Sequence, residues 1–196
     1  VQLCFFSAML VTNDVALLTF VPLTLLLFQE IGDEKSRIWV IVLETAAANL
    51  GSMMTPVGNP QNLYLYAAYQ LHTADFFRTM LPAGVLSWLI LLGLSFLLPK
   101  TPCAGKPVET ASSAIPKKPA AVMLSGFTEN ANALLLGVNL GGLGTPIASL
   151  ASLISYQFYS KAAHSRPGKY LGIFSAVNFG MLAILLAVGW LQLRSF

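Results

Sequence analysis

Three short polar clusters interrupt the apolar sequence of this chain. The first is Thr12-Asn13-Asp14, the second runs from Asn49 to Asn59, and the third runs from Asn139 to Thr145. Side-chain oxygens of this kind suit a hard cation such as sodium, and backbone amides that are freed at a helix terminus attract anions. The clusters therefore predict the binding of small ions, including a hard cation such as sodium near Asn13.

The second and third clusters are predicted to break helices. Proline removes a backbone donor and clashes with the preceding turn, and glycine weakens a helix. We therefore expect two discontinuous helices, and the alternative for each is a proline-kinked helix without a ligand. The candidate binding residues are Asn49, Gly51, Thr55, Pro56, Gly58 and Asn59 at the first break, and Asn139, Gly141, Gly144 and Thr145 at the second.

The two predicted breaks repeat one pattern. At an offset of 90 residues, Asn49-Leu50-Gly51 falls on Asn139-Leu140-Gly141, and Thr55-Pro56 falls on Thr145-Pro146. Chance matches between apolar helices would mostly be Leu, Val and Ala, but the shared residues here are Asn, Gly, Thr and Pro. Two similar broken helices in corresponding positions indicate a secondary transporter that is built from inverted repeats.

The first cluster lies between two short apolar runs. The run from Val1 to Val11 would rise only ~16 Å as a helix, which is too short for a membrane crossing. We expect a re-entrant hairpin with Thr12, Asn13 and Asp14 at its tip. The alternative is a truncated first helix followed by a full one, with the polar residues at the membrane interface.

Acidic residues inside the apolar tracts are functional candidates, because leaving an ionised group in lipid costs at least ~2.5 kcal/mol. These residues are Asp14, Glu44 and Glu129. Asp14 is the strongest candidate and could bind a cation, carry a proton or cap a helix. Glu44 and Glu129 are weaker candidates, the first near the membrane interface and the second in a polar network.

The elements that must position these clusters are membrane helices. Of the 196 residues, 56% are hydrophobic and 10% are charged, against roughly 25% charged in an average soluble domain. A membrane span needs ~20 mostly apolar residues, so Thr79 to Pro99 and Tyr170 to Leu193 are each predicted to be one transmembrane helix. The sequence contains no catalytic triad, phosphate-binding loop or metal-ligand spacing, so we expect neither an enzyme nor a cofactor beyond the coupling ion.

Positive charge is concentrated in two loops, one from Lys100 to Lys118 and one from Lys161 to Lys169. The positive-inside rule places both loops in the cytoplasm, which leaves no need for a nucleic-acid partner. The predicted organisation has three parts. They are a first-repeat part (1–99, with hairpin, broken helix and transmembrane helix), a cytoplasmic loop (100–118), and a second-repeat part (119–196, with broken helix and final transmembrane helix).

The motifs resemble those of a known family. TNDVALLTFVPL (Thr12 to Leu23), NLGSMMTPVGNPQNL (Asn49 to Leu63) and GFTENANALLLGVNLGGLGTPIASLASL (Gly126 to Leu153) are similar to sequences of the citrate-transporter-like permeases. These permeases belong to the ion transporter superfamily, with the sodium/dicarboxylate symporters, the arsenite/antimonite permeases and some sodium/proton antiporters. The resemblance covers nearly the whole chain except the loop from Lys100 to Lys118.

The resemblance implies an all-α polytopic membrane protein of inverted repeats, each with a re-entrant hairpin and a discontinuous helix around a midplane site. Carried over to this chain, the site comprises Thr12 and Asn13 at the hairpin tip, Gly51 and Thr55 to Asn59 at the first break, and Asn139, Gly141, Gly144 and Thr145 at the second. The family also implies a multi-pass protein of the cell membrane, in contact with lipid, and a homodimer.

The implied function is secondary active transport of a small anion, such as a di- or tricarboxylate, coupled to sodium or protons. The alternatives are an arsenite/antimonite or sodium/proton exchanger and a non-transporting remnant of such a permease. Family members are longer and have a second hairpin tip, where this chain has Lys117-Lys118. The sequence therefore resembles a truncated or internally deleted member.

The predicted orientation can be tested with the cysteine in the first basic loop. In a Cys4→Ser variant, Cys103 is the remaining thiol. A membrane-impermeant thiol reagent should leave Cys103 unlabelled in intact cells and should label it after permeabilisation. Labelling of intact cells would contradict the cytoplasmic placement.

Overall fold

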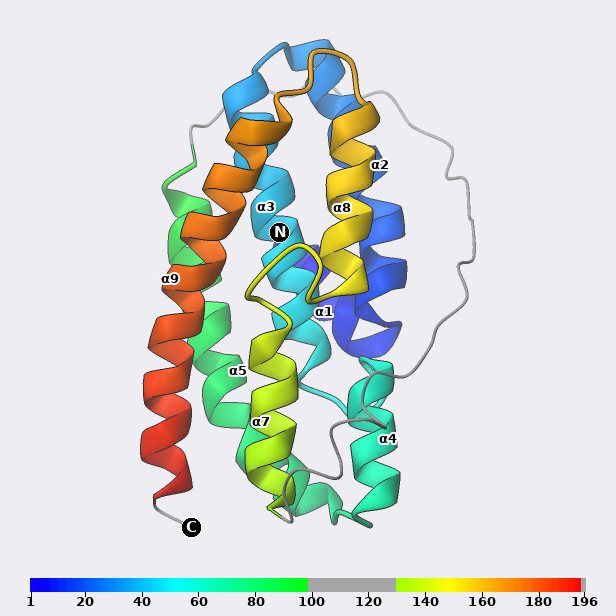
Figure 1. Cartoon of the computed structure of the whole chain (residues 1–196). Helices are drawn as coiled ribbons and strands as arrows, with labels where there is room; N and C mark the ends of the chain where they lie inside the picture. Colours follow the sequence, from blue (N-terminus) through cyan, green and yellow to red (C-terminus); the bar gives the residue numbers. More distant parts are fainter. Residues whose placement is uncertain (99–129, 195–196) are drawn as a thin grey trace.

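The computed structural model describes residues 1–98 and 130–194, and these residues are helical and contain no strand (Figure 1). The all-α class predicted from the sequence is confirmed for this part of the chain. The predicted cytoplasmic loop 100–118, the start of the second-repeat part and Glu129 lie outside the described residues.

The chain begins with a helical hairpin. Helix α1 (Gln2–Leu10) and helix α2 (Asn13–Ile31) are joined by Val11 and Thr12 alone, so the predicted turn lies at the polar cluster. The hairpin ends at Gly32, whose φ of 74° is a left-handed conformation that glycine adopts without strain. Asp33 then caps the next helix by accepting hydrogen bonds from the backbone amides of Lys35 and Ser36.

Both predicted helix breaks are confirmed. Helix α3 (Glu34–Ser52) is separated from α4 (Pro60–Ala68) by residues 53–59, and α7 (Ala131–Gly141) is separated from α8 (Leu150–Lys161) by residues 142–149. In Figure 1 α3 descends to its break and α4 continues downward, whereas α7 rises to its break and α8 continues upward. The two broken segments therefore run in opposite directions, and their breaks meet near the middle of the molecule.

The two long helices are α5 (Thr73–Phe96) and α9 (Pro167–Leu193), each a single element as predicted. Both are long and apolar enough to cross a membrane. Helix α5 begins six residues before the predicted start, because the polar turn Thr73-Ala74-Asp75 already belongs to it. Large apolar side chains on both helices are exposed, as lipid-facing positions require; they include Leu81, Leu89, Phe179 and Trp190.

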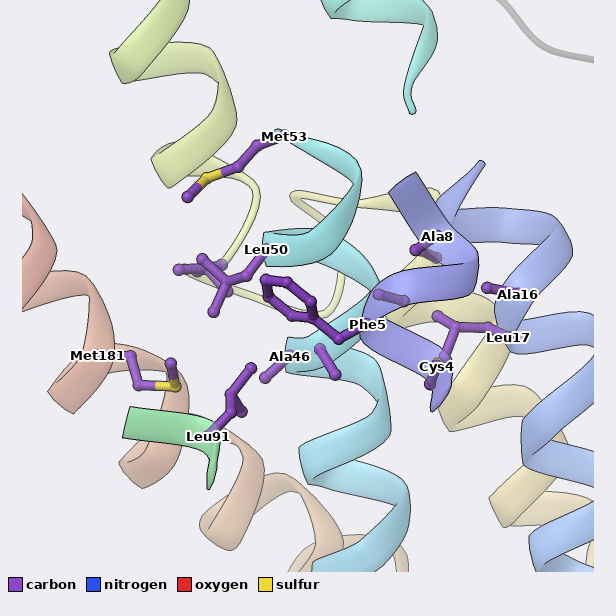
Figure 2. Packing of buried hydrophobic residues seen from close by; sticks show 14 of the residues in the cluster. Cys4, Phe5, Ala8, Ala16, Leu17, Ala46, Leu50, Met53, Leu91 and Met181 are labelled. Atoms are coloured by element: carbon purple, nitrogen blue, oxygen red, sulfur yellow. The ribbon is translucent and has the colours of Figure 1, made fainter. Parts of the chain in front are cut away.

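Helix α3 lies at the centre of the packing. Most of its 19 residues are buried, and it contacts α1, α2, α5, α7, α8 and α9. Figure 2 shows Phe5 of α1 beside Ala46 and Leu50 of α3. Small residues let helix backbones approach closely, and at Gly51 an added Cβ would lie 2.2 Å from the carbonyl oxygen of Phe5. The hairpin α1–α2 therefore packs on α3 through direct backbone contact, and we call this packing its seating on α3.

The repeat supplies a matched pair of substitutions that tests this seating. Gly51→Ala forces α1 away from α3 and should reduce the free energy of unfolding by about 1–3 kcal/mol. Gly141, the equivalent residue in the second repeat, has no described atom within 4 Å of an added Cβ, so Gly141→Ala should be neutral or slightly stabilising. Thermal unfolding of both variants in detergent measures the difference, and equal stability would contradict the close packing at Gly51.

Candidate functional site

The hairpin tip and both helix breaks surround one small polar cavity. Its volume is about 40 Å³, which is room for a few water-sized groups. The described residues that line it carry no charge, and most present an amide or a hydroxyl; they are Asn13, Asn49, Ser52, Asn59, Gln61, Asn139 and Ser149, with Val138, Gly142 and Ala148. The chemistry of the cavity is therefore that of neutral hydrogen-bonding groups.

Asn49, near the end of α3, binds the start of α8. Its Oδ1 accepts a hydrogen bond from Ser149 Oγ at 2.8 Å, and its Nδ2 donates to Ser152 Oγ at 3.0 Å. The Asn49 side chain is only 7% exposed, so these partners satisfy an amide that burial would otherwise destabilise.

Asn139, near the end of α7, binds the start of α4 in the same way. Its Oδ1 accepts from Asn59 Nδ2 at 3.0 Å, and its Nδ2 donates to Asn62 Oδ1 at 2.6 Å. The offset of 90 residues that relates Asn49 to Asn139 also relates Asn59 to Ser149 and Asn62 to Ser152. Each repeat therefore gives the other the same contact, as the two sides of a two-fold symmetric interface do.

The first break satisfies its freed backbone groups with local side chains. Asn62 Nδ2 lies 3.5, 3.2 and 3.1 Å from the carbonyl oxygens of Ser52, Met53 and Thr55. Asn59 caps α4 by accepting from the amide of Asn62 at 2.8 Å. An unpaired backbone group in an apolar interior costs several kcal/mol, so Asn62 makes the break compatible with burial.

The hairpin tip closes one side of the cavity. The backbone amide of Asn13 donates to the carbonyl oxygen of Gly58 at 3.2 Å, and the side-chain Nδ2 of Asn13 donates to Asn49 Oδ1 at 3.3 Å. Thr55 Oγ1 donates to the carbonyl oxygen of Met9 at 2.6 Å and binds the break to α1.

Thr12 holds the tip in a strained conformation. Its φ is 128° and its ψ 151°, a region that β-branched residues rarely adopt, and such strain costs about 1–3 kcal/mol. Its Oγ1 is buried and has no hydrogen-bond partner among the described residues. Strained backbone residues are concentrated at active sites and ligand sites, so Thr12 marks the tip as a candidate for ion contact.

The helix ends around the cavity have complementary polarity. Asn59 and Ser149, the N-caps of α4 and α8, both line the cavity, so two positive helix termini face it. Ser52 ends α3 and Gly142 follows the end of α7, and they bring two negative helix termini to the same place. This arrangement can bind an anion through amides and a cation through carbonyl oxygens.

The structure brings four of the predicted site residues to the cavity wall, namely Asn13, Asn49, Asn59 and Asn139. The others form the supporting backbone: Thr12 and Asp14 in the hairpin, Gly51, Thr55, Pro56 and Gly58 at the first break, and Gly141, Gly144 and Thr145 at the second. Thr145 is exposed. Within residues 1–98 and 130–194 no group of three or more His, Cys, Asp or Glu residues could hold a metal ion.

The sequence reasoning did not identify several polar residues at the site. Ser52, Gln61 and Ser149 line the cavity, and Asn62 and Ser152 bind the two bridging asparagines. The repeat contained a signal for Asn62, Ser149 and Ser152. The offset that aligns Asn49 with Asn139 also aligns Asn59 with Ser149 and Asn62 with Ser152.

Comparison with known proteins gives one family. The family model described as "Citrate transporter" matches residues 1–195. The chain is 38% identical over 91 residues to an uncharacterised transporter of Methanocaldococcus jannaschii, which is 46% of this chain and 26% of that protein. It is 42% identical over 82 residues to the inner membrane protein YbiR of Escherichia coli K12, which is 41% of this chain and 22% of that protein. The chain thus covers about a quarter of each relative, and no solved structure matches it.

The contact between the two breaks predicts the effect of removing one asparagine. Asn139→Ala leaves the buried amides of Asn59 and Asn62 without their partner and should reduce the free energy of unfolding by about 1–3 kcal/mol. Asn178→Ala is the control, because Asn178 is also buried and, within residues 1–98 and 130–194, its side chain bonds to its own helix α9, through Nδ2 to the carbonyl oxygen of Phe174. Thermal unfolding in detergent measures both variants. A loss for Asn139→Ala no larger than that for the control would contradict the bridging role.

Proposed function

The chain belongs to the citrate transporter family, and on that premise we propose that it forms the ion- and substrate-binding part of a secondary active transporter. Its substrate is a small anion such as a di- or tricarboxylate, and its coupling ion is sodium or a proton. The observation that carries the proposal is the convergence of two broken helices and a hairpin tip on one polar cavity.

We interpret the two halves of the described chain as inverted repeats. The support is threefold: the sequence offset of 90 residues, the opposite directions of the two broken segments in Figure 1, and the reciprocal contacts of Asn49 and Asn139. In this arrangement α1 and α2 form a re-entrant hairpin, and the chain is a multi-pass protein of the cell membrane. Substrate sites of such transporters lie at the interface between repeats.

The charges of the helix ends support recognition of an anion together with a cation. The N-termini of α4 and α8 attract carboxylate groups. Asn13 and the carbonyls that end α3 offer oxygens to sodium without bringing a charge of their own. Ligand pockets are typically about 300–1,000 Å³, so a cavity of about 40 Å³ holds an ion or waters, and entry of the anion requires the hairpin or the half-helices to separate.

Transport by reconstituted protein tests the proposal. The full chain in proteoliposomes should take up radiolabelled citrate or succinate along a sodium or proton gradient. Uptake of arsenite without these carboxylates would favour the exchanger, and absence of both uptake and substrate binding would identify a non-transporting remnant.

Substitutions at the hairpin tip identify the coupling ion. Asn13→Ala removes one uncharged cation ligand and should weaken the apparent sodium affinity by about tenfold, or roughly 1.4 kcal/mol. Asp14→Asn should abolish the dependence on the proton gradient if Asp14 carries the proton, and should only reduce sodium affinity if sodium is coupled. Sodium and pH are varied separately, with Asn178→Ala as the control. If neither substitution changes either dependence, the tip is structural.

A further inference from the structure

Glu44 is a buried carboxyl that the candidate site does not use. It lies on α3, five residues before Asn49, and its side chain is 4% exposed. It does not line the cavity. Its burial in the helix bundle differs from the interfacial position that the sequence suggested.

Both arms of the hairpin contact Glu44. On α2, Thr24 Oγ1 donates to Glu44 Oε1 at 2.8 Å. On α1, Cys4 Sγ donates to the carbonyl oxygen of Glu44 at 3.4 Å. Glu44 Oε2 is buried and has no hydrogen-bond partner among the described residues. The carboxyl therefore lies in the interface that seats the hairpin on α3, with half of its hydrogen-bonding capacity unused.

The groups that face Glu44 include one positive charge, the amino group of Val1, which favours the carboxylate, and otherwise only an uncharged thiol and hydroxyls. From α1 come the Cys4 thiol and the amino group of Val1, and from α9 comes the buried hydroxyl of Tyr170. From α2 comes the uncharged hydroxyl of Thr24. Within the described part of the chain, no Lys, Arg or His side chain forms an ion pair with Glu44.

This environment favours the neutral acid. An ionised carboxylate that is buried with a single hydroxyl donor carries a large desolvation penalty, whereas the protonated acid carries only that of a polar group. When the proton leaves, the carboxylate needs water or new donors. The hairpin covers Glu44 from two sides, so it is the element that must move to admit water.

We propose that Glu44 is a proton-binding site that is occupied in this conformation, and that release of the proton to entering water unseats the hairpin α1–α2 from α3. Because Asn13 lies at the tip of that hairpin, the closure of the candidate site then depends on pH. The consequence for transport rests on the proposed function, but the protonation and the seating do not.

Infrared difference spectroscopy tests the protonation directly. The full chain at neutral pH should show the carbonyl stretch of a buried carboxylic acid, and this band should be absent in Glu44→Gln. The amide of Gln can still accept from Thr24, so the variant keeps the packing of the hairpin. A spectrum without a difference between the two proteins would overturn the proposal.

The thiol of Cys4 reports whether the hairpin is packed on α3, because Cys4 lies on α1 and is fully buried in the contact between α1 and α3. In a Cys103→Ser background, the rate of maleimide modification of Cys4 should rise from mildly acidic to mildly alkaline pH, several-fold more than in Glu44→Gln. The remaining rise in Glu44→Gln measures the ionisation of the thiol itself. Glu34→Gln is the matched control, because Glu34 begins the same helix and pairs with Arg166 at 3.1 Å; it should behave like the parent.

The amino group of Val1 requires a separate control. An N-terminal extension replaces this amine by a peptide bond and removes its charge, and the pH response of Cys4 should persist. Loss of the response in the extended protein would assign the titration to Val1, and an equal response in Glu44→Gln would assign it to another group. Either outcome would overturn the proposal, and neither measurement requires transport.

Discussion

The structure depends on how two interrupted helices satisfy their backbone groups inside an apolar bundle. Hydrocarbon offers no hydrogen bonds, so the carbonyls and amides freed at residues 53–59 and 142–149 need partners within the protein. At the first break Asn62 faces three carbonyl oxygens and Asn59 caps the following helix. The same requirement accounts for a cavity lined by amides and hydroxyls, since these groups pair with backbone without the desolvation penalty of a charge.

The contact between the breaks links the two halves of the chain. Asn49 bonds to the start of α8 and Asn139 to the start of α4, so each broken segment supplies what the other needs. Such reciprocity keeps four helix ends at one level and concentrates their partial charges on a small volume. The site is therefore a property of the pair of segments, and a single broken helix would have neither the cavity nor the partners of its asparagine.

The hairpin forms a third side of this arrangement. Its seat on α3 includes the backbone approach at Gly51, the contact of Glu44 with Thr24, and the tip contact of Asn13 with Gly58. The strained φ of Thr12 and the unused oxygen of Glu44 show that this seat is not fully relaxed. A hairpin packed in this way can respond to a small ligand such as a cation or a proton. Binding of either one changes the free-energy difference between the packed and the separated hairpin by a few kcal/mol.

The sequence by itself determined the features that arise from local backbone chemistry. Glycine and proline ended α3 and α7 at the predicted clusters, the polar triplet placed the hairpin turn, and uncharged length identified α5 and α9. Only the tertiary structure decided which side chains meet. Ser149 and Ser152 became partners of Asn49 across about a hundred residues, and Asn62 became the partner of Asn139. Tyr159 of α8 is buried and stacks on Tyr170 of α9. The periodicity and composition of one segment fix its own conformation, but the partner of a side chain depends on how distant segments cross.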